Sequence, residues 1–151
     1  MQANKLRLAQ AAELYASHGI PVFPLTPRDK HPFRGSRGFY DATADIDQVR
    51  RWWREHPEAN IGVALGEPSG RWLLDCDAKS GGLETLAALL NGHGDLDGAA
   101  WANSGGGGKH ACFVWTPELT WLRCGPLPGG IDIKATGGYA CHPPVLGRSC
   151  G

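Results

Sequence analysis

The chain has 151 residues, of which 42% are hydrophobic and 20% charged, and its formal net charge is zero. This length and composition favour one folded domain and exclude both a disordered chain and two independent domains of ordinary size. Because no apolar stretch approaches the roughly 18 residues of a membrane span, and five cysteines without CxxC spacing suggest neither a zinc ribbon nor a disulfide framework, we expect a soluble, cytoplasmic protein that does not contact a membrane.

The N-terminal segment predicts a helix, a strand and a long loop. An approximately helical apolar stripe over residues 6–15 predicts an opening helix, and His18-Gly19 supplies its stop signal. Residues 20–25 then indicate a buried strand. Residues 26–43 are too rich in Pro, Gly and Arg for a helix or a strand, so they predict a surface loop.

A second helix and two strands follow. Asp45 begins this helix, with Gln48 at the spacing of a capping box, and Pro57 ends it. Residues 60–66 and 71–77 indicate two strands separated by the turn sequence EPSG. We expect these two strands to form a hairpin.

The remaining chain is dominated by strands. A short helix is expected from Gly82, followed by strands at residues 99–102, 110–115, 131–135 and 139–141. The mixed order of helices and strands indicates an α+β or α/β protein, with helices packed on sheets.

Two aspartates at the end of an apolar strand are the first candidate site. Side chains alternate along a strand, so Asp75 and Asp77 should share a face, roughly 6–7 Å apart. A divalent cation would relieve their repulsion, and hard oxygen ligands favour Mg²⁺ or Mn²⁺ over zinc. Asp77 can instead begin a turn or cap the helix that follows, and the pair alone is a weak pattern.

A third aspartate could complete the site. Asp132 lies between Ile131 and Ile133, which should face the core while the carboxylate faces the other side. If this strand lies beside the first, three carboxylates can hold two metal ions about 3.5–4 Å apart. Polymerases and many nucleases use this chemistry.

The run NSGGGGKH is a candidate cradle for a triphosphate. Its glycines allow the backbone to approach an anion closely, and a lysine and a histidine follow them. It is not a Walker A loop, because no GK[ST] follows and a strand comes next. The alternative is a hairpin turn with an incidental histidine. The candidate nucleotide-binding residues of this run are Ser104, Gly106, Gly107, Lys109 and His110.

Four segments match a known family in order and spacing along nearly the whole chain. They are AAELYASHGIPVFPL with the later Lys30-His31-Pro32, YDATADIDQVRRWWREHPEANIGVALGEPSGRWLLDCDAKSGG, SGGGGKHACFVW and LPGGIDIKATGGYACHPP. Together they resemble the bifunctional primase-polymerase family of the archaeo-eukaryotic primase superfamily. The combined pattern is far more specific than any one motif.

The resemblance implies an α+β protein with the archaeo-eukaryotic primase fold. In this fold an αβ unit, here about residues 1–60, packs on a unit similar to an RNA-recognition-motif sheet, here about residues 61–151, and the active site lies between them. The resemblance further implies that Asp75, Asp77 and Asp132 bind two Mg²⁺ or Mn²⁺ ions and that His110 contacts the triphosphate. Lys30, in the basic loop, is a further candidate contact to the nucleotide.

The implied function is template-directed nucleotidyl transfer from an NTP or dNTP to a 3′-hydroxyl, in the replication of a phage, plasmid or integrated element. The expected partners are a single-stranded DNA template, the nucleotide and a helicase domain or protein. Family members usually continue beyond the position of Gly151, so we expect a catalytic domain cut short at its C-terminal end.

Two alternatives stay open. One is another metal-dependent phosphoryl or glycosyl transferase or hydrolase, because paired aspartates serve those enzymes too. The other is a non-catalytic replication module that binds single-stranded DNA through the basic loop from Arg28 to Arg37.

Overall fold

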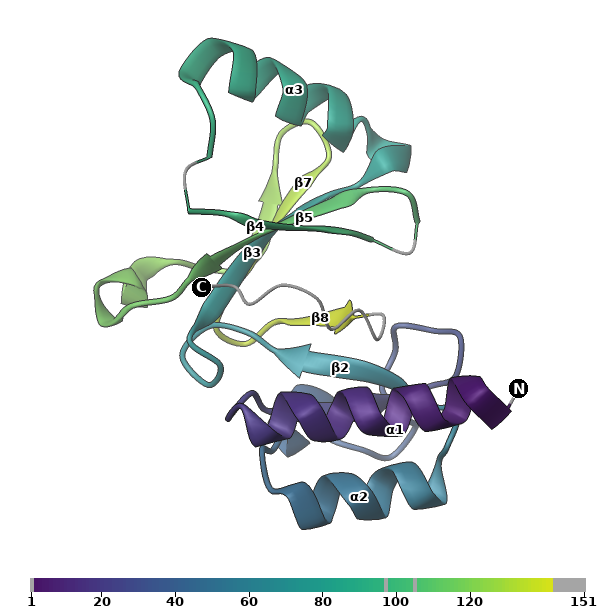
Figure 1. Ribbon diagram of the computed structural model, residues 1–151. Coiled ribbons are helices and arrows are strands. Elements are labelled where there is room, and N and C mark those ends of the chain that lie inside the picture. The colour runs from purple at the N-terminus through teal and green to yellow at the C-terminus, as the bar shows by residue number, and fades with distance from the viewer. Residues whose placement is uncertain (1, 97, 105, 143–151) are drawn as a thin grey trace. The chain divides into compact units, whose positions relative to one another are not determined.

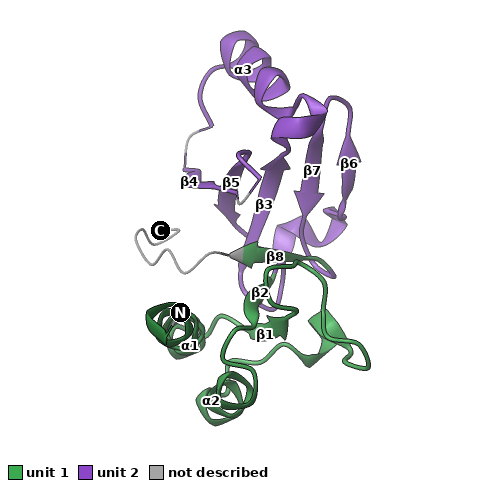
Figure 2. Cartoon of the chain, turned by 90° about the vertical axis from the view of Figure 1, so that its right-hand side faces the viewer, with its two compact units in different colours: residues 1–64, 138–146 green, residues 65–137, 147–151 purple. Residues whose placement is uncertain are grey.

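The protein has helices and antiparallel sheets grouped in two compact units (Figures 1 and 2). The computed structural model describes residues 2–96, 98–104 and 106–142. The first unit consists of residues 1–64 and of a later segment that begins at residue 138. The second unit consists of residues 65–137, which lie between them in the sequence. The predicted α+β class is confirmed. No helix within the described ranges is long and apolar enough to cross a membrane.

The first unit consists of two helices and a three-stranded sheet in the order β1-β2-β8. Its elements are α1 (Gln2–Ser17), β1 (Val22–Leu25), the 3-10 helix η1 (Gly38–Asp41), α2 (Ile46–Glu55), β2 (Asn60–Ala64) and β8 (Tyr139–His142). The predicted helices and strands of residues 1–57 are therefore present, and the expected loop contains a 3-10 turn that the sequence did not reveal.

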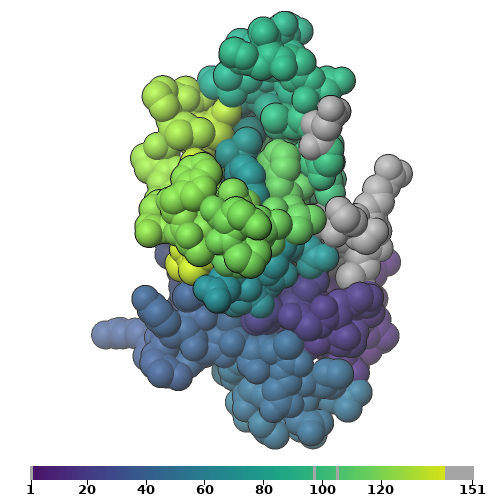
Figure 3. Space-filling view, turned by 90° about the vertical axis from the view of Figure 1, so that its left-hand side faces the viewer, coloured from purple at the N-terminus to yellow at the C-terminus, as the bar shows by residue number. Residues whose placement is uncertain are grey.

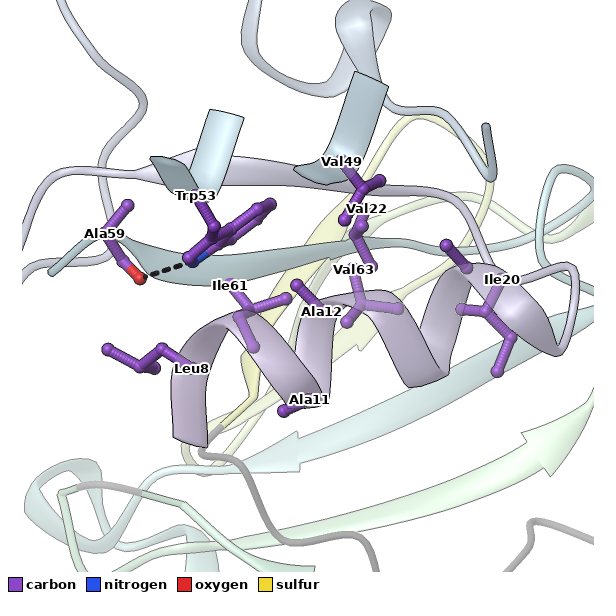
Figure 4. Close-up of a cluster of buried hydrophobic side chains, with 11 residues drawn as sticks. Leu8, Ala11, Ala12, Ile20, Val22, Val49, Trp53, Ala59, Ile61 and Val63 are labelled. Atoms are coloured by element: carbon purple, nitrogen blue, oxygen red, sulfur yellow. Dashed lines mark hydrogen bonds between the residues drawn. The ribbon is translucent and has the colours of Figure 1, made fainter. Parts of the chain in front are cut away.

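The core of the first unit lies where α1 and α2 meet the sheet (Figure 4). Val22 and Val63 are register partners, so their side chains point to the same side. Val49 and Trp53 of α2 are buried in the same cluster, and the Trp53 indole Nε1 donates a hydrogen bond to the Ala59 carbonyl (3.1 Å). Burying side chains of this size contributes about 1.5–3 kcal/mol each.

The start of α2 shows half of the predicted capping box. The Asp45 side chain accepts a hydrogen bond from the backbone N–H of Asp47 (3.0 Å). The Gln48 Oε1, however, accepts from the Arg51 guanidinium (2.8 Å). Asp45 is the predicted N-cap, whereas Gln48 pairs along the helix with the residue one turn later.

The second unit is a five-stranded antiparallel sheet in the order β4-β5-β3-β7-β6, so β3 is its central strand (Figure 2). Its elements are β3 (Arg71–Cys76), the 3-10 helix η2 (Ala78–Ser80), α3 (Gly82–His93), β4 (Ala100–Asn103), β5 (Lys109–Val114), the 3-10 helix η3 (Pro117–Trp121), β6 (Gly125–Leu127) and β7 (Ile131–Lys134). The sequence predicted β3, β4, β5, β7 and α3 but missed β6, whose three residues are too few to show a period.

Helix α3 covers one face of this sheet. Cys76 and Ile131 are buried with Leu86 of α3, and Leu74 packs against the same cluster. The outer side of α3 is exposed to solvent, as the teal-green segment at the top of Figure 3 shows. Because side chains alternate along strands, the neighbours of these residues, Asp75 in β3 and Asp132 in β7, point to the face away from α3.

The predicted hairpin of residues 60–66 and 71–77 is wrong. Strand β2 pairs with β1 and β8, whereas β3 pairs with β5 and β7. The turn between them forms as expected, but it closes only one isolated bridge, between Gly66 and Arg71. Gly66 also packs so closely on Thr136 that a Cβ would lie 2.1 Å from the Thr136 nitrogen. The two strands therefore leave the turn into different sheets.

Candidate active site

Three polar side chains form a row across the middle of the five-stranded sheet. Asp75 of β3 is the register partner of His110 in β5 and of Asp132 in β7. Directly opposed residues of antiparallel strands point to the same side, with their Cβ atoms about 4.5–5.5 Å apart. The strand of Asp132 therefore lies beside the strand of Asp75, as a shared site would require. The row lies on the sheet face away from α3.

His110 is the most enclosed member of the row. Its side chain is 9% exposed, and its Nε2 lies 3.3 Å from the Asp75 Oδ1, whose side chain is 33% exposed. A buried imidazole without a partner would lose its hydrogen bonds to water. The carboxylate supplies one such partner and fixes the orientation of the ring.

A lysine that the sequence reasoning did not single out lies beside Asp132. The Lys134 Nζ lies 3.5 Å from the Asp132 Oδ2. The two residues are two apart in β7, which places them on the same face. This alternation in the sequence IDIK was the available signal.

Asp77 lies one residue beyond β3 and caps η2. Its Oδ1 accepts from the backbone N–H of Lys79 (2.9 Å) and its Oδ2 from the Ser80 hydroxyl (3.0 Å). The capping role left open by the sequence is therefore present. An ionised carboxylate has about four acceptor positions, so capping does not exhaust the capacity of Asp77 to bind a cation.

Two glycines in the turn before β7 pack closely against the first turn of α3 and the segment that joins it to β3. Gly130, in the turn before β7, has φ +84°, and a Cβ there would lie 2.3 Å from the Ser80 carbonyl oxygen. Its own carbonyl accepts from the backbone N–H of Asp77 (3.0 Å). Thr85 of α3 donates its hydroxyl hydrogen bond to the carbonyl of Gly129 (2.7 Å). These contacts fix Asp77 relative to the strand that carries Asp132.

The glycine-rich run forms the hairpin loop between β4 and β5. The backbone N–H of Ser104 donates to the Gly108 carbonyl (3.0 Å), and that of Gly107, with φ +84°, donates to the Ser104 carbonyl (3.2 Å). A Cβ on Gly108 would lie 2.3 Å from the Cys76 carbonyl oxygen. Gly108 is therefore needed for close packing on the end of β3, whereas Gly106 has open space at its Cβ position.

Of the two predicted lysines, Lys109 belongs to the second unit but lies off the row, and Lys30 belongs to the first unit. Lys109 is the register partner of Cys76, which packs toward α3, so alternation puts Lys109 on the opposite face from His110. Lys30 belongs to the first unit, where its carbonyl accepts from the Tyr139 hydroxyl (2.8 Å). The phosphate-binding roles of Lys109 and Lys30 stay predictions, as do those of Ser104, Gly106 and Gly107.

The thiol of Cys76, next to Asp75 in the chain, is buried on the α3 face of the sheet. Burial raises its pKa above the usual value, and the neighbouring Asp75 carboxylate raises that pKa further. Cys76 therefore stays a neutral thiol at physiological pH and acts as a packing residue.

The donor set of the row suits a hard divalent cation. Asp75 and Asp132 present carboxylates from neighbouring strands, which are the ligands that Mg²⁺ and Mn²⁺ prefer. As the side chains lie, no three His, Cys, Asp or Glu residues in the described part of the chain gather into a metal site. Asp75 and Asp132 are therefore two candidate ligands for such an ion, and the predicted three-carboxylate site with Asp77 stays a prediction.

Comparison with known families gives one match that covers most of the chain. The family model of the bifunctional DNA primase/polymerase, N-terminal domain, matches residues 12–149. A comparison with curated proteins found no match. The matched region includes the whole row and the glycine-rich hairpin. The chain belongs to the bifunctional DNA primase/polymerase family.

Proposed function

We propose that this chain is the catalytic domain of a DNA primase/polymerase that transfers nucleotides from NTP or dNTP to a 3′-hydroxyl under the direction of a single-stranded DNA template. The observation that carries the proposal is the row of Asp132, Asp75 and His110 across three neighbouring strands. Family membership supplies the class of reaction. The proposed setting is the replication of a phage, plasmid or integrated element, with a helicase as partner.

In the proposed mechanism Asp75, Asp77 and Asp132 bind two Mg²⁺ or Mn²⁺ ions. When bound, such ions activate the attacking hydroxyl and stabilise the charge on the leaving pyrophosphate. The protein contributes ligands of fixed geometry: Asp75 and Asp132 sit in paired strands, and Asp77 is tied to the turn before β7. Such preorganisation reduces the rearrangement needed when substrate binds.

His110 is proposed to contact the triphosphate of the incoming nucleotide. It lies next to Asp75 and is held between β3 and β4, so its ring has little freedom to reorient. An imidazole N–H can donate to a phosphate oxygen. We assign the hairpin residues Ser104, Gly106 and Gly107 to the same nucleotide, together with Lys109 and Lys30 as longer-range cations. The archaeo-eukaryotic primase arrangement of the two units is part of this proposal.

A primer-synthesis assay on single-stranded DNA tests the reaction class. Labelled NTP or dNTP is supplied with Mg²⁺ or Mn²⁺, and products are resolved by length. We expect template-dependent extension that EDTA abolishes. Shortening of the DNA or turnover of a sugar nucleotide would instead support a hydrolase or glycosyl transferase. Salt-sensitive DNA binding without any incorporation would support the non-catalytic module.

A further inference from the structure

We propose that Lys134 is a nucleotide-binding residue that makes metal binding and triphosphate binding depend on each other. The inference rests on the proposed function, because it concerns the same carboxylates. The observation is the ion pair between the Lys134 Nζ and the Asp132 Oδ2, at 3.5 Å, on the strand next to Asp75.

The position of Lys134 keeps its ammonium group at the acidic row. Its register partner is Leu73, which is fully buried and occupies the same face of β3 as Asp75. The Lys134 side chain is only 32% exposed, and its charged end reaches Asp132. A lysine placed for solubility alone would extend into water.

The ammonium group of Lys134 would have opposite effects on the binding of a metal ion and of a nucleotide triphosphate. A divalent ion ligated by Asp132 would lie within a few ångströms of the ammonium group, and like charges at that distance repel. A triphosphate carries several negative charges, which the same ammonium attracts. Lys134 therefore weakens the binding of a metal ion alone and favours the binding of metal and nucleotide together.

The coupling has a functional consequence. A ligand that changes the affinity for a second ligand is itself affected by the same factor. Lys134 therefore favours complete assembly of the site when the nucleotide arrives, and it can leave Asp132 for a phosphate oxygen at that moment. The flexible four-carbon stem of lysine allows such an exchange.

The experiment compares wild-type protein with Lys134→Gln and Lys134→Arg. Binding of Mn²⁺ alone is measured by electron paramagnetic resonance of the free ion, and binding of a fluorescent dNTP is measured at saturating Mn²⁺. We expect Lys134→Gln to bind Mn²⁺ alone about 30-fold more tightly at low ionic strength, because a unit charge roughly 4 Å from a divalent ion costs about 2 kcal/mol in a water-exposed setting. The same variant should bind the dNTP several-fold more weakly, and Lys134→Arg should restore both values.

Two controls keep the outcomes distinct. Lys5→Gln removes a positive charge from the first unit, where Lys5 pairs with Glu58, and should change neither affinity. Asp132→Asn should lose Mn²⁺ binding. If wild type binds Mn²⁺ no better than Asp132→Asn, the proposed function and this inference both fail. If wild type does bind but Lys134→Gln binds Mn²⁺ no more tightly, only the role of Lys134 is overturned.

Discussion

The two units differ in what their buried and half-buried residues do. In the first unit, the sheet face under α1 and α2 is apolar, and the ion pairs are peripheral, such as Arg50 with Glu13. In the second, α3 covers an apolar sheet face, while the other face carries His110, Asp75 and Asp132. Polar groups at the centre of a sheet cost desolvation energy. Packing therefore accounts for the first unit, whereas the second unit carries partly exposed carboxylates beside a buried histidine on the sheet face away from α3.

Removing the largest buried side chain of the α1–α2 core should produce the greatest loss of stability. Trp53 is 3% exposed, so Trp53→Ala leaves a cavity and an unpaired carbonyl at Ala59. We expect a loss of about 3–5 kcal/mol in the free energy of unfolding, measured in urea. Trp121→Ala is the matched control because Trp121 is 68% exposed, and it should change stability by less than about 0.5 kcal/mol. Equal effects of the two substitutions would contradict the packing described here.

The glycine-rich hairpin offers a test within the second unit. Gly108→Ala places a Cβ against the Cys76 carbonyl oxygen, so β5 must shift from β3. We expect a destabilisation of about 1–3 kcal/mol and a loss of nucleotide incorporation, because the shift moves His110 away from Asp75. Gly106→Ala meets nothing within 4 Å and should leave stability within about 0.5 kcal/mol of wild type. If Gly108→Ala is as well tolerated as Gly106→Ala, the close approach is not required.

Asp77 has two roles that substitution can separate. Asparagine caps as well as aspartate but lacks its charge, so Asp77→Asn should keep stability within a few tenths of a kcal/mol while incorporation falls more than about 100-fold. Asp77→Ala removes the cap as well and should lose about 0.5–1 kcal/mol of stability. Thermal unfolding and the primer assay together measure both effects. Full incorporation by Asp77→Asn would leave capping as the sole role of this residue.

The sequence predicted the helices and strands better than it predicted which strands pair with each other. The helices at residues 2–17, 46–55 and 82–93 show in periodicity and stop signals, because those signals are local. The hairpin of residues 60–77 was wrong because strand pairing is decided by residues far apart in the chain. The turn at Gly66 is compatible with either pairing.

The same distinction applies to the candidate site. Alternation along one strand predicts that Asp75 and Asp77 share a face, but only the register of three strands aligns Asp75 with His110 and Asp132. The glycine run predicts a cradle for an anion, which stays a prediction, and only the structure shows that the backbone of Cys76 leaves no room for a side chain at Gly108. Such a close approach between distant segments leaves no sequence pattern of its own.

The most direct test of the central claim is Mn²⁺-dependent incorporation of labelled nucleotide by Asp75→Asn beside Glu84→Gln. Both substitutions change a carboxylate to an amide in the second unit, but Glu84 is exposed on α3. With both variants folded by circular dichroism, we predict that Glu84→Gln incorporates nucleotide at the wild-type rate and that Asp75→Asn falls by more than about 1,000-fold, as loss of a metal ligand requires. Wild-type incorporation by Asp75→Asn would contradict the assignment of the row as the catalytic centre.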